Sequence, residues 1–212
     1  GVQTCALPIC LVVTGTALAG RVSVGDSLWL TGCDRPVRVR GIHAQNQPSE
    51  NAHAGQRIAL NLSGEVNKDQ ISRGDWLLAQ RPSEAASSRI LVALDPIAPI
   101  QHWQPLHLHH AASHITGRIS LLEEPSPESV VQLAELVLDS PLWLVENDTL
   151  IMRDISARTT LGAARVLQIS SPRRGKRLPV FLNWLQQLAN AKSDAEVLAL
   201  RLPKGTLSIP NF

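Results

Sequence analysis

Short apolar runs separated by glycine-containing turns recur through most of the chain, and this spacing constrains the fold more than any other feature. Strands at roughly 8–12-residue spacing, with glycine turns and almost no helix, are typical of closed β-barrels. Residues 11–81 are therefore predicted to form a first barrel that includes a polar loop at residues 43–54. Its clearest strands are expected at Leu11–Thr16, Ser27–Leu30, Gln56–Leu62 and Trp76–Ala79.

The stretch between these strands shows the alternation of a half-buried strand. Val37, Val39 and Ile42 are expected on one face, with a slip in the alternation at Gly41. Arg38 and Arg40 share the other face, which we expect to be solvated.

A second β-rich series follows a short polar linker at residues 81–86. It predicts a second barrel over residues 87–171, with a loop tip at residues 123–129. The expected strands are Arg89–Leu94, Pro105–His110, Ile115–Leu122, Val130–Leu138, Trp143–Val145, Leu150–Asp154 and Thr159–Ile169.

The composition changes after residue 171. A basic linker (SPRRGKR) with little to bury is followed by Val180–Ala191, whose apolar residues have the spacing of an amphipathic helix. The sequence Ser193-Asp194-Ala195-Glu196 is a capping-type start for a second helix. The predicted fold is therefore all-β, with two translation-factor-type β-barrels and a short, incomplete helical segment at residues 172–212.

The ends of the chain look unlike parts of a domain. Residues 1–10 (GVQTCALPIC) resemble a translated sequencing adapter, and they have no basic flank or apolar run long enough for a signal peptide. We expect this segment to be an artefact and the chain to be a fragment truncated at both ends.

Composition narrows the class of protein. A length of 212 residues with 44% hydrophobic residues suits one or two globular domains, and a net charge of +2 excludes a strongly basic tail. The basic residues cluster at 35–40 and 173–177, which favours a phosphate-bearing partner. Tyr is absent and Phe occurs twice, so base stacking is not expected and the five Trp are expected in the core.

The expected compartment is the cytoplasm, and no membrane partner is expected. The three Cys have no metal-ligand spacing and form an odd number, which suits a reducing environment. No apolar run reaches the roughly 18 residues that a membrane span requires.

The chain contains no phosphate-binding glycine loop, no serine-hydrolase elbow and no zinc-protease motif. The cluster of His107, His109, His110 and His114 leaves two alternatives open. Alternation puts His107 and His109 on one strand face, so a two-histidine metal site in a β-barrel enzyme is geometrically possible. No carboxylate or Cys nearby completes it, so an exposed polar face or a phosphate-contacting surface is the other interpretation. We predict no metal site and no catalytic residues.

Arg57 is a cation at the start of an apolar strand. It can be a surface arginine whose stem covers apolar neighbours. It can also be a fixed positive charge that binds an anionic ligand.

Several segments resemble a known family. LVVTGTALAGRVSVGDSLWLTG resembles the start of domain II of translational GTPases, and AGQRIALNLSG with ISRGDWL matches later strands of that domain. HHAASHITGRISLLE and LVLDSPLWLVENDTLIMRDISARTTLGAARVL resemble domain III of the selenocysteine-specific elongation factors. PRRGKRLPVFLNWL resembles the linker into their C-terminal winged-helix region.

The resemblance implies a function in translation. It implies that the intact protein carries selenocysteyl-tRNA to the ribosome at UGA codons, and that it is a monomer. GTP and Mg²⁺ would bind to a domain outside this chain, which by itself would hold no cofactor and have no GTPase activity. A selenocysteine-insertion mRNA hairpin would bind through the C-terminal winged-helix domain. The alternative is a barrel pair of another translational GTPase that binds tRNA or the ribosome without selenocysteine specificity.

The resemblance also implies roles for individual residues. Arg57 stands where elongation factor Tu-like proteins have an Asn near the aminoacyl end of tRNA, and an Arg stands there in the selenocysteine factors. A selenol is more acidic than a thiol, whose pKa is about 8.5, so a guanidinium at this position favours the selenolate. Further contacts to tRNA or other RNA are expected from His109, His110, His114, Arg153, Arg173, Arg174, Lys176 and Arg177.

Overall fold

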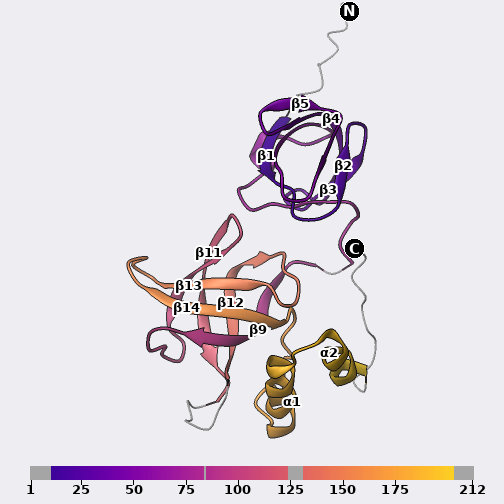
Figure 1. Cartoon of the computed structure of the whole chain (residues 1–212). Helices are drawn as coiled ribbons and strands as arrows, with labels where there is room; N and C mark the ends of the chain where they lie inside the picture. The colour runs from indigo at the N-terminus through magenta and orange to yellow at the C-terminus, as the bar shows by residue number, and fades with distance from the viewer. Residues whose placement is uncertain (1–10, 84, 124–130, 203–212) are drawn as a thin grey trace, which may run out of the picture. The chain divides into compact units, whose positions relative to one another are not determined.

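The computed structural model describes residues 11–83, 85–123 and 131–202, which divide between Pro82 and Ser83 into two compact units (Figure 1). The adapter-like segment 1–10 and most of the loop expected at 123–129 lie outside the described residues. Among the described residues, no helix combines the length and the apolar character needed to cross a membrane.

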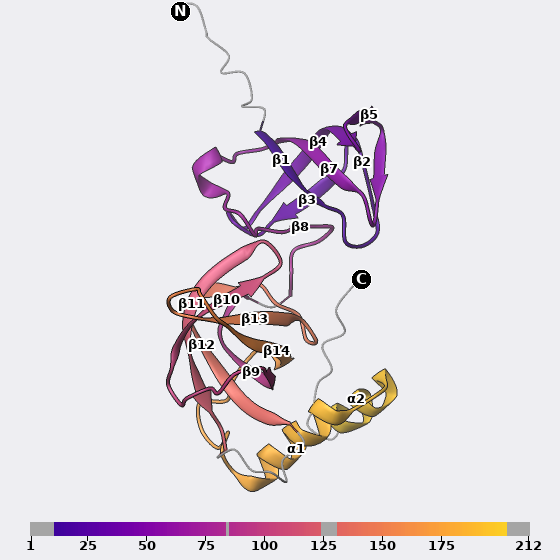
Figure 2. The ribbon, with the colours of Figure 1, turned by 60° about the vertical axis from the view of Figure 1, so that its left-hand side comes forward.

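The first unit is built on a six-stranded antiparallel sheet with the order β1-β7-β4-β3-β8 and with β5 paired to β4 (Figure 2). The alternation predicted for its long strand is confirmed. Val37, Val39 and Ile42 are buried, Arg38 and Arg40 are exposed, and the register shifts between Val39 and Gly41. The strands are β1 (Leu11–Thr16), β2 (Arg21–Ser23), β3 (Ser27–Leu30), β4 (Arg35–Ala44), β5 (Gln47–Ser49), β6 (Asn51–His53), β7 (Arg57–Ser63) and β8 (Leu77–Leu78), with a 3₁₀ turn at Lys68–Gln70.

Two expectations for the first unit need correction. The ladder among its described strands does not close, because β8 has two residues and pairs only with β3, while β2 and β6 form a separate ribbon. The segment 43–54 is not a loop: it contains the end of β4 and a hairpin into β5. Gln45 and Asn46 both have positive φ (51° and 67°), as a two-residue hairpin turn requires.

The second unit contains a closed six-stranded antiparallel barrel with the order β10-β11-β12-β9-β14-β13. This confirms the barrel predicted for residues 87–171. Its interior is almost entirely aliphatic and includes Leu106, Leu108, Ile119, Leu136 and Met152. The strands are β9 (Ser87–Pro96), β10 (Pro105–His110), β11 (Ser113–Leu121), β12 (Gln132–Leu142), β13 (Thr149–Asp154) and β14 (Thr160–Gln168).

The strand expected at Trp143–Val145 does not form. Strand β12 already extends to Leu142, and the following residues turn toward β13. The Asp148 carboxylate accepts a hydrogen bond from the Val145 amide at 2.8 Å and fixes this turn.

Two helices complete the second unit and lie to one side of its barrel in both Figure 1 and Figure 2. They are α1 (Pro179–Asn190) and α2 (Asp194–Arg201), and the Ser193 hydroxyl caps α2 by accepting from the Glu196 amide, as its sequence predicted. Leu185 and Leu188 of α1 are buried against outward-facing barrel leucines such as Leu133. Strands β9, β12 and β14 therefore have apolar residues on both faces, because one face lines the barrel and the other contacts α1.

Candidate nucleic-acid interface

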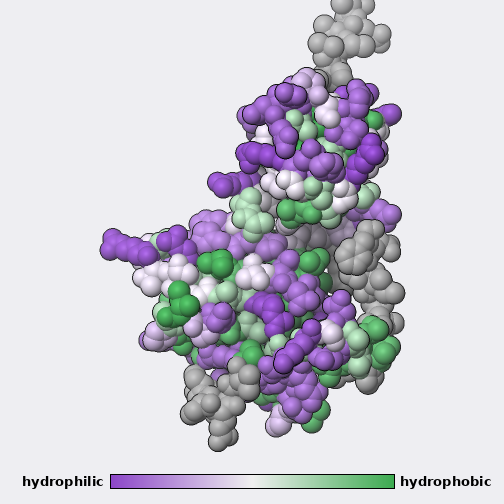
Figure 3. All heavy atoms as spheres, viewed as in Figure 1, coloured by the Kyte–Doolittle hydropathy of each residue, from purple (hydrophilic) through white to green (hydrophobic). Residues whose placement is uncertain are grey.

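Arg57 is the first residue of β7 and lies beside the hairpin between β4 and β5. It pairs with Thr16 of β1, and its carbonyl accepts a hydrogen bond from the Gln45 amide at 3.3 Å. Its side chain is exposed. Hydrophilic residues cover most of the first unit's surface in the view of Figure 3.

The guanidinium of Arg57 forms no hydrogen bond or ion pair within the described part of the chain. Some arginines of the first unit are engaged: Arg35 contacts Glu65 at 3.3 Å, and Arg40 donates to the Ser63 hydroxyl at 2.7 Å. Arg81 contacts Asp34 at 2.7 Å and lies over the Trp29 ring. The exposed Arg21, Arg38 and Arg73 resemble Arg57 in having no such partner in the described part of the chain. Arg57 therefore presents its charge to solvent, where an anionic ligand can reach it.

A second group of candidate RNA-binding side chains lies on the outer face of the barrel in the second unit. Leu106 and Leu108 point into the barrel, so His107 and His109 point outward, as alternation predicted. Cross-strand register places His114 opposite His109 and Arg153 opposite His107. These four residues, His107, His109, His114 and Arg153, are called the histidine face below.

The rings of the histidine face are in direct contact. His114 Nε2 lies 2.7 Å from His107 Nδ1, so one of the two nitrogens donates to the other. The rings of His109 and His114 stack with their centroids 4.7 Å apart. Arg153 donates to the Ala157 carbonyl. In the described structure, His109 Nε2 and Arg153 Nε are buried and have no hydrogen-bond partner.

The electrostatic environment disfavours charge on His109. Burial of the ring lowers the pKa of His109, and the neighbouring His114, Arg153 and His107 lower it further. The free protein therefore keeps this ring neutral near pH 7.

The histidine side chains of the histidine face were also candidate metal ligands in the sequence. The described residues contain no group of three His, Cys, Asp or Glu side chains arranged to hold a metal ion. The nitrogens of His107 are already engaged, one with His114 and the other with the Ile155 carbonyl at 3.0 Å.

His110 does not belong to the histidine face. It follows Leu106 and Leu108 in the inward series, its side chain is buried, and its Nε2 lies 3.1 Å from the Asp148 carboxylate. The expectation that His110 contacts RNA is therefore wrong for this conformation, because the barrel wall covers the ring.

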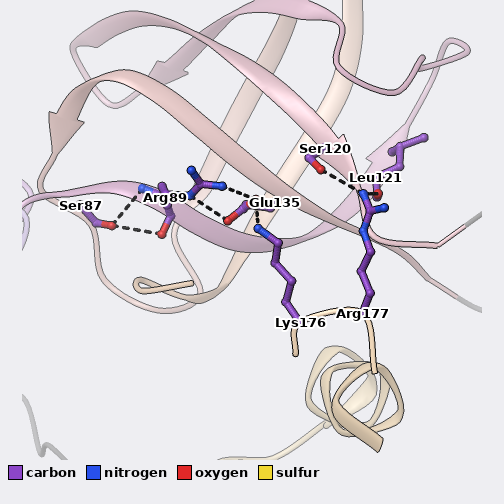
Figure 4. A network of polar contacts seen from close by, with 7 residues as sticks. All are labelled: Ser87, Arg89, Ser120, Leu121, Glu135, Lys176 and Arg177. Atoms are coloured by element: carbon purple, nitrogen blue, oxygen red, sulfur yellow. Dashed lines mark hydrogen bonds and ion pairs between the residues drawn. The ribbon is translucent and has the colours of Figure 1, made fainter. Parts of the chain in front are cut away.

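The basic linker divides into two pairs of residues. Arg173 and Arg174 are exposed, as expected for RNA contacts. Lys176 and Arg177 are attached to the barrel instead (Figure 4): Lys176 Nζ contacts Glu135 at 2.6 Å, and Arg177 donates to the Leu121 carbonyl at 3.0 Å. Both side chains thus have partners within the protein, while Arg177 is exposed and Lys176 partly exposed, so their expected RNA contacts stay a prediction.

Glu135 is the structural anchor that the sequence analysis missed. Its side chain is 1% exposed, and Arg89 donates two hydrogen bonds to it, at 3.1 and 3.0 Å. Burial alone would raise the pKa of Glu135, but the hydrogen bonds from Arg89 and Lys176 outweigh burial and lower that pKa. The sequence did contain a signal for this burial, because Glu135 is the one acid within an apolar run (LAELVL).

Trp103 was also misjudged, because it was expected in the core. It is 48% exposed, in a turn where its φ is 64°. The Arg118 guanidinium lies 6.0 Å from its ring centroid and donates to the Trp103 carbonyl. The connection before β10 thus holds an aromatic ring in solvent.

Comparison with known proteins agrees with this architecture. Residues 87–173 match the family "Selenocysteine-specific elongation factor, beta-barrel domain", and residues 179–212 match "Selenocysteine-specific elongation factor, winged helix 1/3". Residues 11–78 match "Elongation factor Tu domain 2". The selenocysteine-specific elongation factor of Escherichia coli K12 is 58% identical over 202 residues, which cover 95% of this chain and 32% of that protein. The chain belongs to the selenocysteine-specific elongation factor family.

Other selenocysteine-specific elongation factors support the same conclusion. The Haemophilus influenzae protein is 43% identical over 90% of this chain and 31% of its own length. The chain therefore spans about a third of the length of these two relatives. A crystal structure of bacterial EF-Sec shares the fold, with a TM-score of 0.71 at 24% identity over 90% of this chain and 30% of that one. Apo SelB from Methanococcus maripaludis has a TM-score of 0.65 at 17% identity over 76% of this chain and 41% of its own.

The boundaries of the family matches coincide with features of the fold. The division between Pro82 and Ser83 falls between the matches that end at residue 78 and begin at residue 87. The winged-helix match of the selenocysteine-specific factors begins at Pro179, where α1 begins.

Proposed function

We propose that this chain is the part of a selenocysteine-specific elongation factor that holds selenocysteyl-tRNA for incorporation at UGA codons. In this proposal residues 11–81 are domain II, residues 87–171 are domain III, and residues 172–212 lead into the winged-helix region. The observation that supports it best is Arg57, an exposed cation without a partner among the described residues, in a chain of this family.

The chemistry of the amino acid explains why an arginine suits this position. Selenocysteine is largely an anion at neutral pH, whereas the hydroxyl of serine is neutral. A hydrogen bond to a charged group contributes roughly 1.5–3 kcal/mol. Arg57 would therefore favour the selenocysteyl end over the seryl end by about ten- to a hundredfold.

Other residues would contact the RNA backbone. The candidates whose side chains are not buried are His109, His114 and Arg153 of the histidine face and Arg173, Arg174, Lys176 and Arg177 of the linker. Such contacts are independent of the attached amino acid and weaken with added salt.

The whole protein would need segments beyond this chain. GTP with Mg²⁺ would bind to one of them, and a solved relative from Methanococcus maripaludis is in complex with the GTP analogue GPPNHP. The ribosome and a selenocysteine-insertion mRNA hairpin would be further partners, and the protein would act as a cytoplasmic monomer. The alternative of a general tRNA-binding factor is not favoured, because the closed barrel matches the selenocysteine-specific family over residues 87–173.

The test is Arg57→Ala in the full-length factor, with competition between selenocysteyl-tRNA and seryl-tRNA. We expect the variant to lose roughly ten- to a hundredfold of its preference for selenocysteyl-tRNA, with little change in the salt dependence of binding. Arg57→Lys should restore part of the preference, because an ammonium lacks the planar guanidinium fork. Equal weakening of all aminoacyl-tRNAs would show that Arg57 is a general contact.

A further inference from the structure

The histidine face combines three imidazoles and a guanidinium, and none of the four forms an ion pair with a carboxylate in the described structure. The nearby acids have other partners. Asp139 of β12 accepts from the Thr116 hydroxyl, and Asp154 of β13 accepts from the Thr159 amide at 2.6 Å. Arg153 supplies a permanent positive charge.

The contact geometry limits how many protons the free face can hold. His107 Nδ1 and His114 Nε2 are 2.7 Å apart, so only one of these two nitrogens can bear a proton. A second proton on this pair would break the hydrogen bond and bring a cationic His107, which already donates from Nε2 to the Ile155 carbonyl, against the N–H of His114. His109 stacks on His114 and adjoins the same charges. The lowered pKa of His109 is consistent with this restriction.

An anion bound to the histidine face would favour protonation of its rings instead of opposing it. A phosphodiester keeps its negative charge across the range in which histidine titrates, so only the protein changes protonation. Its charge would offset the repulsion among the rings and Arg153, and a protonated ring would become a donor to a phosphate oxygen.

We infer that the histidine face is a proton-coupled phosphodiester site, at which an RNA backbone phosphate binds together with about one proton. This inference rests on the RNA contact proposed above and adds that the contact strengthens on acidification. If about one proton is taken up throughout this range, binding tightens about tenfold per pH unit, or up to roughly a hundredfold between pH 8 and pH 6.

The test measures binding of this chain to a short fluorescein-labelled RNA duplex by anisotropy, from about pH 6 to pH 8. Ionic strength is kept constant, because counterion release would otherwise dominate the result. His114→Gln is the test variant, since the ring is exposed and glutamine does not titrate. His53→Gln is the matched control, because His53 is an exposed histidine of the first unit. The binding enthalpy of the unaltered chain in two buffers of different ionisation enthalpy counts the protons independently of any variant.

The expected result is binding that tightens by up to roughly a hundredfold from pH 8 to pH 6, a response that His114→Gln flattens and His53→Gln preserves, with uptake of about one proton. RNA binding without a pH response, or an unchanged response in His114→Gln, overturns the inference and leaves the proposed RNA contact standing. Absence of RNA binding at every pH overturns the contact itself. Equal, pH-dependent binding of poly-glutamate in place of RNA would assign the face to an acidic protein partner and would also overturn the inference.

Discussion

Among the polar residues of the second unit, Glu135 is a buried carboxylate enclosed by Arg89 and Lys176 (Figure 4). A buried charge is tolerated only when its hydrogen bonds are satisfied. Because Lys176 belongs to the linker and Arg89 to β9, this carboxylate helps to attach the linker to the barrel, together with the contact of Arg177 with the Leu121 carbonyl.

Glu135→Gln should lower the free energy of unfolding of the second unit by about 1–3 kcal/mol at pH 7. The lowered pKa of Glu135 means that the unfolded chain binds its proton more tightly than the folded chain does. This contribution is present above the unfolded pKa of about 4.3 and is lost as the pH falls through the folded pKa. Denaturant unfolding at a series of pH values should therefore show less acid destabilisation in the variant.

Asp95→Asn is the matched control for this prediction. It makes the same carboxylate-to-amide change at an exposed position of β9 and should alter stability by less than about 0.5 kcal/mol. Equal effects of the two substitutions would show that the Glu135 contacts contribute nothing specific.

Sequence reasoning at the residue scale succeeded where one strand decides the outcome. Alternation alone placed His107 and His109 outward, and the position of Arg57 followed from the start of an apolar strand. It failed for Glu135, because the burial of this acid depends on Lys176, 41 residues away in the chain. It failed for Trp103 because a turn with positive φ, not an apolar pattern, decides where that ring lies.

At the scale of elements, the contact between α1 and the outside of the barrel is the main finding. Leu188→Ala in α1 should lower the free energy of unfolding by about 2–4 kcal/mol, because Leu188 is 3% exposed against barrel leucines. Val180→Ala in the same helix should change it by less than about 0.5 kcal/mol, since Val180 is 79% exposed. Similar values from chemical denaturation would mean that α1 is not docked in solution.

The sequence predicted the elements whose signals are local. The expected helix at 180–191 is α1 at Pro179–Asn190, and the closed barrel matches its predicted residues closely. The predicted closure of the first barrel is not confirmed, because β8 pairs only with β3 among the described strands. The hairpin between β4 and β5 was mistaken for a loop because its polar residues hide the strand pattern, although Asn46 suits the positive φ of its turn.

For the molecule as a whole, the two units predict a simple proteolysis pattern. Elastase should cut first among the small residues between Pro82 and Ser87 and release two resistant fragments. The second fragment should keep α1 and α2, because Lys176, Arg177 and the apolar face of α1 attach them to the barrel. Mass spectrometry of the fragments measures this, and early loss of the helices from the second fragment would contradict the expectation.

Deleting residues 1–10 should leave the melting temperature of the chain unchanged. Strand β1 begins at Leu11 and pairs with β7 along its full length, from Leu11 opposite Leu62 to Thr16 opposite Arg57. Extending the deletion through Thr16 removes that strand and should lower the melting temperature of the first unit sharply. A scanning calorimetry trace distinguishes the two deletions.

The covered outer face of the barrel also affects how the chain is made. All six barrel strands are synthesised before α1. They leave the exit tunnel first, and Leu91, Leu133 and Leu167 then still face water. The nascent protein passes through a stage in which the barrel core is packed but its outer apolar surface is exposed, which favours aggregation or chaperone binding. That stage ends only when Leu185 and Leu188 emerge from the exit tunnel, so a pause in translation that leaves β14 outside the tunnel and α1 inside it would prolong the stage.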